Sequence, residues 1–190
     1  ADQARRERKT RDAVGNGDRI MDSTELRAMQ APIKDRYKAD PKAAFITLKA
    51  KGSLDSEGLS CKVETGKAAA AIAGLHPATG GSGLELCSGD MLLEALVACA
   101  GVTLKSVATA IDAPLKSGNV VAEGDLDFRG TLGVDKEAPV GFAEIRLRFD
   151  VDTDAPQEKL DQLLKLTERY CVVYQTIKNG PKTVVSLNRV

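Results

Sequence analysis

The stretch that most constrains the fold is MLLEALVACAGVTL, an almost wholly apolar run from Met91 to Leu104. Drawn as a helix, the run is apolar on nearly every side, whereas a surface helix carries only one apolar stripe. It falls short of the roughly 20 residues that a membrane-spanning helix needs, and Glu94 interrupts it. The run is therefore predicted to be a buried core helix, enclosed either by a sheet or by a second subunit.

Strand signals lie on both sides of this helix. Segments 44–50 and 59–65 are rich in strand formers and are joined by a polar connection, which is typical of a hairpin. Segments 121–130 and 142–152 alternate apolar and charged side chains, so each has one face for the core and one for water. A last strand is expected after the Gly-Pro pair at 180–181.

Capping residues mark the helices. Asp22 or Ser23 is the expected cap of a first helix, with Pro32 and Pro41 interrupting the chain after it. Ser88 or Asp90 is the expected cap of the apolar helix, and Asp154 the expected cap of a later helix that ends near Cys171. The order of elements predicts an α+β fold in which helices pack against a largely antiparallel sheet.

Composition limits the partners of the chain. Its 190 residues hold 27 Lys and Arg against 27 Asp and Glu, and only 4% are aromatic. Such a balance predicts no binding to nucleic acid or to a membrane surface. Residues 1–42 are predicted to be a charged, partly helical extension and residues 43–190 the domain itself. The charged start has no apolar stretch after it, which favours a cytoplasmic protein without a secretory signal.

The cysteines are too few and too widely spaced for a disulfide scaffold or a structural zinc site. They are Cys61, Cys87, Cys99 and Cys171, and no two have the CxxC spacing. The single histidine, His76, lies in the loop-like GLHPATGGSG stretch, where a solvated side chain is the usual role. We therefore expect neither a metal nor a cofactor.

A reactive cysteine needs thiolate character, which a helix N-terminus or a nearby cation supplies. By this criterion Cys87, just before the apolar helix, ranks above Cys99 in its middle, and Cys171 is a further candidate beside Arg169. Taken singly, each thiol is more typical of a structural cysteine. A thiol on the buried helix and another at the end of a later helix could, however, meet in the core and close a disulfide after oxidation.

Two stretches carry a resemblance to a known family. SGDMLLEALVACAGVTL, followed about 70 residues later by LLKLTERYCVVYQTIKNG, resembles the OsmC/Ohr family of osmotically inducible and organic hydroperoxide resistance proteins. The GGSG loop and the closing GPKTVVSL segment also match in kind. The resemblance covers roughly residues 43–190 and is to a less characterised OsmC-like branch.

The resemblance implies an intertwined homodimer, with a largely antiparallel sheet wrapped around long central helices and two sites at the interface. By position, Cys99 resembles the peroxidatic thiol and Cys171 the resolving thiol. The implied substrate is a small hydroperoxide. The implied reductant is an external dithiol, which is a lipoylated protein in the hydroperoxide resistance branch.

Two further residues complete the implied site. Asp90, nine residues before Cys99, is the acid nearest to the position where the peroxidase branch carries a glutamate, which is Gly89 here. Nine helical residues span about 13.5 Å, so Asp90 would act through an arginine, for which Arg36 is the candidate. Val172 stands where better known branches have proline. These departures bear on the activity rather than on the fold.

Three hypotheses follow. The first is a thiol-dependent peroxidase, acting in oxidative stress defence, that uses Cys99 and Cys171. The second is a non-catalytic dimer of the same fold that binds a small apolar ligand between its subunits. The third adds a docking role for the N-terminal 40 residues, which hold ten basic and eight acidic side chains.

Overall fold

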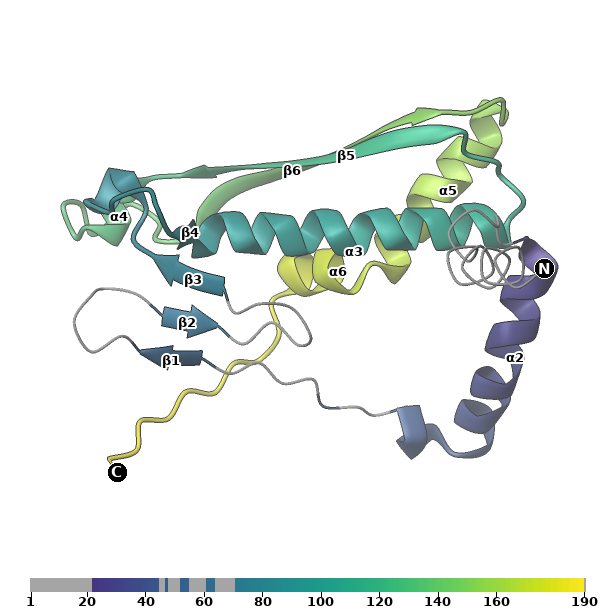
Figure 1. Cartoon of the computed structure of the whole chain (residues 1–190), viewed down its shortest axis with the longest axis horizontal. Helices are drawn as coiled ribbons and strands as arrows, with labels where there is room; N and C mark the ends of the chain where they lie inside the picture. The colour runs from purple at the N-terminus through teal and green to yellow at the C-terminus, as the bar shows by residue number, and fades with distance from the viewer. Residues whose placement is uncertain (1–21, 45–46, 48–51, 55–60, 64–70, 190) are drawn as a thin grey trace, which may run out of the picture.

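A computed structural model describes residues 22–44, 47, 52–54, 61–63 and 71–189 (Figure 1). The elements in chain order are α2 (Ser23–Ala39), η1 (Pro41–Ala44), β1 (Gly52–Leu54), β2 (Cys61–Val63), β3 (Ala71–Gly74), η2 (Pro77–Thr79), β4 (Leu86–Cys87), α3 (Ser88–Ala110), β5 (Ser117–Leu126), α4 (Phe128–Thr131), β6 (Phe142–Asp152), α5 (Gln157–Tyr170) and α6 (Val172–Asn179).

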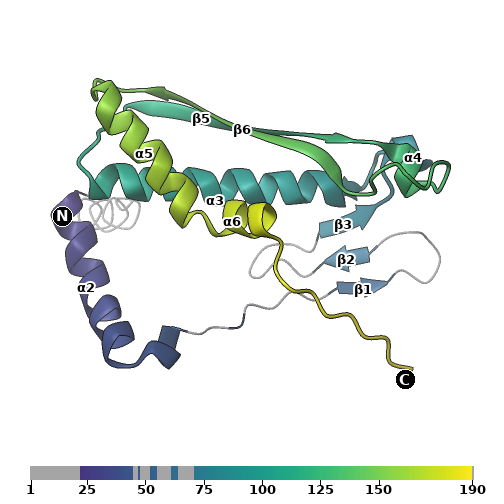
Figure 2. The same ribbon diagram turned by 180° about the vertical axis from the view of Figure 1, so that it is seen from behind.

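Helix α3 is the axis of the molecule. A two-stranded antiparallel sheet, β5–β6, runs along one side of it, and α5 and α6 cross it on another side (Figures 1 and 2). The strands β1–β2–β3–β4 form a small second sheet next to its N-terminal end, with β3 and β4 parallel and the other pairs antiparallel. The predicted α+β class is confirmed, and the strands are divided between two sheets.

The long β5–β6 ladder confirms the alternation read from the sequence, with one adjustment. Ala122 and Gly124 on β5 face inward with Ile145 and Leu147 on β6. A register shift between Asp125 and Leu126 pairs Leu126 with Phe142. Such an irregularity re-aims the side chains around it, so Phe142 is half-buried and Ala143, which was predicted to face the core, is exposed.

Two hydrophobic clusters line the buried side of α3. The cluster at its C-terminal end is built on Leu104, Val107, Ala108 and Leu163, and β6 and α5 pack on it. The cluster at its middle is built on Leu96, Ala100 and Cys171, with Cys99 and residues of β5, β6 and α6 around it. Ala100 is fully buried, and small residues at this point let β5 approach the helix closely.

Helix α2 confirms its predicted start. The Asp22 side chain accepts a hydrogen bond from the Glu25 amide at 2.8 Å, and the Glu25 side chain bonds back to Asp22, which is a complete capping box. The helix continues past Pro32, where the sequence predicted an interruption. Proline removes one helical hydrogen bond and can kink a helix without ending it.

Other boundaries differ from the sequence predictions. The strand predicted at 44–50 lies mostly outside the described residues, and β1 begins at Gly52, within the predicted hairpin connection. Strand β3 was not predicted. The strand predicted over 121–130 ends at Leu126, because the Asp127 side chain accepts a hydrogen bond from the Arg129 amide at 3.0 Å and starts the short helix α4.

The predicted caps of α3 and α5 are also wrong. Cys87 is the N-cap of α3, with Ser88 and Asp90 inside its first turn. Pro156 is the N-cap of α5, while Asp154 instead pairs with Lys116 at 2.7 Å.

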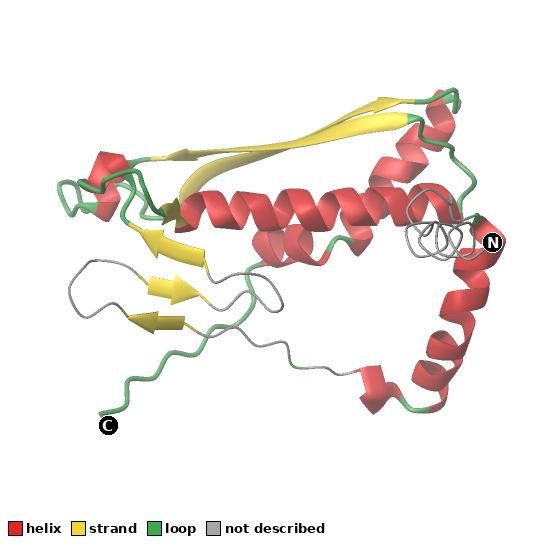
Figure 3. Ribbon diagram, in the orientation of Figure 1, coloured by secondary structure: helices red, strands yellow, loops and turns green. Residues whose placement is uncertain are grey.

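The closing strand is the largest discrepancy. Residues 181–189 have no regular secondary structure and extend away from the body (Figure 3). Their apolar side chains are exposed: Val184 by 83%, Val185 by 93% and Leu187 by 99%. A strand forms only where its backbone pairs with another strand, and the described part of this single chain provides no pairing for the segment.

Helix α3 extends beyond the apolar run at both ends and stops just before the Asp-Ala-Pro stretch at 112–114, where the sequence predicted its end. With 23 residues and a mean hydropathy of 1.7 in its most apolar window, it is long and apolar enough to cross a membrane by length and composition alone. The core helix of a soluble protein meets the same two criteria. Here β5–β6 cover α3 on one side and α5 and α6 cross it on another (Figure 2), and 28% of the apolar window is buried within the chain.

Candidate thiol site

The site is built where the middle of α3 meets the junction of α5 and α6. Cys99 lies half-buried in the middle of α3, one turn after Leu96 and next to Ala100. These two neighbours are 1% and 0% exposed, so the helix is anchored in the core on either side of the thiol. The position of Cys99 along α3 is therefore fixed by packing.

Cys171 marks a break between two helices. Its backbone is extended, with φ −73° and ψ 108°, so it is both the last cap of α5 and the N-cap of α6. Its amide donates to the Thr167 carbonyl and its carbonyl accepts from the Gln175 amide, both at 2.9 Å. The Gln175 side chain donates to the Glu168 carbonyl at 2.7 Å and so bridges the break. These bonds hold the first turn of α6 in a fixed direction.

The break brings the two thiols together. Cys171 is 1% exposed and belongs to the same cluster as Leu96 and Ala100, on which Cys99 packs. The two thiols are close enough for each to shift the pKa of the other. Both are free thiols. The meeting of two thiols in the core, which sequence spacing alone left open, is present in the structure.

The environment of Cys99 favours its thiolate. Partial burial, the largest single influence, acts to raise the pKa of Cys99. Hydrogen bonds from the Val173 amide, the Cys171 thiol, the Val172 amide and the Thr103 side chain together outweigh burial and leave the pKa below its ordinary value. The two amides belong to the first turn of α6, where unpaired N–H groups and the helix dipole stabilise an anion.

Cys171 is shifted in the opposite direction. Burial raises the pKa of the Cys171 thiol, the Tyr174 amide counteracts this in part, and the neighbouring Cys99 raises the pKa further. Of the two thiols, Cys99 therefore loses its proton at the lower pH. A half-buried sulfur that ionises more readily, next to a buried one that keeps its proton longer, is suited to attack by the first and disulfide closure by the second.

Alkylation against pH is expected to separate the two thiols. Because the thiolate is the nucleophile, a group with a lowered pKa reacts at lower pH, so the Cys99 peptide should reach half-maximal iodoacetamide labelling below the usual thiol range and the Cys171 peptide above it. Pulse labelling read by peptide mass spectrometry measures both curves in one sample. Cys171 labelling first would contradict these directions.

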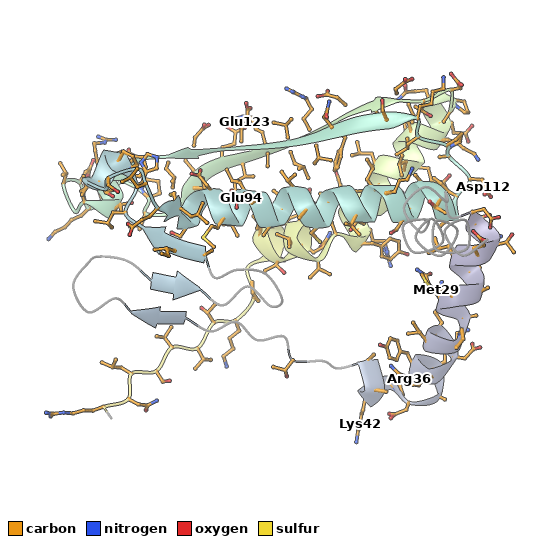
Figure 4. All side chains as sticks on the ribbon, viewed as in Figure 1. Met29, Arg36, Lys42, Glu94, Asp112 and Glu123 are labelled. Atoms are coloured by element: carbon orange, nitrogen blue, oxygen red, sulfur yellow. The ribbon has the colours of Figure 1, made fainter. Side chains whose placement is uncertain are left out.

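The structure keeps the other candidate residues of this chain apart from the pair. Asp90 is exposed in the first turn of α3. Glu94, labelled in Figure 4, is exposed one turn later. Arg36 lies on the part of α2 that extends away from α3, with its side chain 5.1 Å from the Tyr37 ring and its Nη2 donating to the Tyr37 hydroxyl at 3.4 Å (Figure 4). Within one chain neither Asp90 nor Arg36 is brought to Cys99, and their predicted roles stay predictions.

Cys87 and His76 have local structural roles away from the Cys99–Cys171 cluster. Cys87 is the half-buried N-cap of α3, and the side chain of Cys61 on β2 lies outside the described residues. His76 caps the short helix η2, accepts a hydrogen bond from the Ala78 amide at 3.0 Å and stacks on Phe128. In the described part of the chain no three His, Cys, Asp or Glu side chains are grouped as metal ligands.

The groups that lower the pKa of Cys99 were not predicted from the sequence. Helix α6 was not predicted, so the amides of Val172 and Val173 were not candidates, and Thr103 was not singled out. A signal for α6 was present in VVYQTIKN, where Val173, Tyr174 and Ile177 share one helical face and pack into the cluster. The i to i+4 spacing of Cys99 and Thr103 was equally visible.

The segment that contains both thiols matches a known protein family. The model of the OsmC-like protein family matches residues 80–186, which include α3, β5–β6, α5, α6 and both thiols. The chain belongs to the OsmC-like family. No curated protein sequence matches it.

Solved structures show the same fold. An OsmC-like protein from Mycoplasma pneumoniae is 15% identical with a TM-score of 0.58, and the similarity covers 71% of this chain and 89% of that one. An organic hydroperoxide resistance protein from Legionella pneumophila is 16% identical with a TM-score of 0.55, covering 72% and 92%. One from Elizabethkingia anophelis is 14% identical with a TM-score of 0.55, covering 72% and 91%. At such identities the likeness shows that this chain has the OsmC-like fold.

Proposed function

We propose that this OsmC-like protein is a thiol peroxidase that reduces organic hydroperoxides or hydrogen peroxide in oxidative stress defence. The Cys99 thiolate attacks the terminal peroxide oxygen, the O–O bond breaks, and the alkoxide takes a proton and leaves as an alcohol. Cys99 is oxidised to a sulfenic acid. The Cys171 sulfur then attacks the Cys99 sulfur, its proton leaves with the hydroxyl as water, and a disulfide forms.

The observation that carries the proposal is that the pKa values of the two neighbouring thiols are shifted in opposite directions. The pKa of Cys99 is lowered by the first turn of α6 and by its neighbours despite partial burial, while burial and Cys99 itself raise the pKa of Cys171. Cys99 is also the more exposed of the two sulfurs. A peroxide arriving from solvent therefore meets first the thiol that ionises more readily, and the resolving thiol lies in the same cluster.

Turnover requires a reductant. An external dithiol donates two electrons and two protons to the Cys99–Cys171 disulfide and leaves as its own disulfide. A lipoylated protein is a candidate for this donor. Since such a thiol pair turns over only where reductants are supplied, we place the protein in the cytoplasm.

We also propose that the working form is a homodimer. One side of α3 is covered within the chain, but Leu92 and Val102 on the same helix are 41% and 69% exposed. The segment 181–189 leaves three apolar side chains exposed as well. A second copy that covers these surfaces would satisfy the all-round apolar pattern of the helix, and it is the route by which Arg36 and Asp90 would reach a thiol pair.

The second candidate is a dimer that binds a small apolar ligand between its subunits, and the observation that bears on ligand binding is a cavity within the chain. A cavity of about 470 Å³ lies between β6, α5 and α6. Its lining is mostly apolar and includes Leu96, Ile145, Phe149, Leu164 and Ile177. This volume is in the range of small-molecule sites. The cavity adjoins the thiol cluster through Leu96, so it is equally suited to an apolar part of a peroxide substrate.

Stoichiometric oxidation tests the peroxidase directly. One equivalent of cumene hydroperoxide added to the fully reduced protein is expected to yield one equivalent of cumyl alcohol and to remove two thiols per chain. Cumyl alcohol is measured by chromatography and thiols by titration under denaturing conditions. An unchanged thiol count with intact hydroperoxide would rule the peroxidase out.

A further inference from the structure

Thr103 carries the one hydroxyl among the groups that act to lower the pKa of Cys99. It lies half-buried one turn after Cys99 on α3, so both side chains are on the same face of the helix. Its hydroxyl donates to the Cys99 carbonyl at 2.7 Å. The Thr103 side chain is also among the hydrogen-bonding groups that act to lower the pKa of Cys99.

The hydroxyl has a single proton for two acceptors. While Cys99 is a thiol, the proton goes to the Cys99 carbonyl, as observed, and an oxygen lone pair can accept the S–H. That carbonyl does not depend on the hydroxyl, because the Thr103 amide is its ordinary partner in the helix. When Cys99 ionises, the proton can therefore turn to the sulfur without leaving a buried carbonyl unpaired.

We propose that Thr103 is a positioning residue for the peroxidase reaction, which turns its hydroxyl proton from the Cys99 carbonyl to the Cys99 sulfur when the thiol ionises. Together with the Val172 and Val173 amides of α6 it fixes the direction of the sulfur lone pairs. Hydrogen bonds to an ionised group are the stronger ones, so the donor acts mainly on the thiolate. The proposal rests on the peroxidase function and adds a specific residue to it.

A test of Thr103 must leave the other titratable groups near Cys99 unchanged. The cluster around Cys99 contains Cys171 and Tyr174, and the Lys178 ammonium lies 5.4 Å from the centre of the Tyr174 ring. None of these is changed by a substitution at Thr103. A change in the ionisation of Cys99 in such a variant therefore reports on the hydroxyl.

The same helix provides a matched control. Thr109 is also a half-buried residue, and its hydroxyl donates to the Lys105 carbonyl at 3.0 Å with the same i to i−4 geometry, in a more exposed hydrogen bond. No thiol is one turn before it. Thr103→Val and Thr109→Val each remove one hydroxyl without changing the branched shape of the side chain, and Thr103→Ser restores the hydroxyl.

The test compares these variants with the wild type in two assays. In iodoacetamide pulse labelling, the half-maximal pH for the Cys99 peptide is expected to rise by about one unit in Thr103→Val and to stay unchanged in Thr109→Val. The rate of cumene hydroperoxide reduction at pH 7 is expected to fall about fivefold in Thr103→Val, and Thr103→Ser should recover to within about twofold of the wild type.

Equal labelling curves for Thr103→Val and the wild type would overturn the proposal, and so would an equal shift in Thr109→Val. If the wild type reduces no hydroperoxide, the peroxidase proposal fails, and the labelling curves still decide whether Thr103 stabilises the thiolate. The two failures are thereby distinguished.

Discussion

Replacing Cys99 with serine is expected to lower hydroperoxide reduction by more than about 100-fold. A serine hydroxyl stays protonated near neutral pH, so the α6 amides and the Thr103 hydroxyl have no anion to stabilise. Cys171→Ser should keep the first step, because the sulfur that attacks is untouched. It should stop after one turnover with a sulfenic acid at Cys99, which dimedone traps for mass spectrometry.

Cys87→Ser is the matched control, since Cys87 is a half-buried thiol at the start of the same helix. It is expected to keep the wild-type rate. If Cys99→Ser kept the wild-type rate, the attacking sulfur would be elsewhere. If Cys99→Ser kept full cellular function without peroxidase activity, the ligand-binding dimer would be the better account.

Leu96→Ala is expected to lower the free energy of unfolding by about 2 to 5 kcal/mol. Leu96 is 1% exposed and packs in the cluster that joins α3, β6 and α6, so its truncation removes buried surface and leaves a cavity under the thiol pair. Urea denaturation at a fixed protein concentration measures the loss. The fixed concentration matters because self-association adds to the apparent stability.

Leu132→Ala is the control for this variant. Leu132 is 54% exposed at the end of α4, in the connection between β5 and β6, and its truncation should change the stability by less than about 0.5 kcal/mol. Equal losses in the two variants would show that the cluster around Leu96 is not the core of the domain.

The parts of the fold that follow from local patterns were predictable. The alternation over 142–152 gave β6 with its observed bounds, and Asp22 with Glu25 gave the start of α2. The apolar run gave α3. For these elements the signal lies in residues adjacent in sequence or on one helical face, so neighbouring side chains carry the information. The resemblance pointed to Cys99 and Cys171, which lie in one cluster, and their pairing as a disulfide stays a prediction.

The parts that depend on distant contacts were not predictable. Helix α6 follows an extended residue inside what looked like one helical segment, and its direction is set by its packing on α3 and by the Gln175 bridge. The segment 181–189 has the composition of a strand, yet pairing decides whether a strand forms. The ranking of Cys87 above Cys99 considered only the N-terminus of α3. The helix terminus that acts on Cys99 belongs to α6 and not to α3.

Peptide mapping after oxidation tests the central claim most directly. The reduced protein is treated with one equivalent of cumene hydroperoxide, alkylated, digested without reduction and analysed by mass spectrometry. The account predicts a Cys99–Cys171 disulfide, with Cys61 and Cys87 recovered as alkylated thiols. Four alkylated thiols would contradict it and would leave Cys99 as a packing residue of the core.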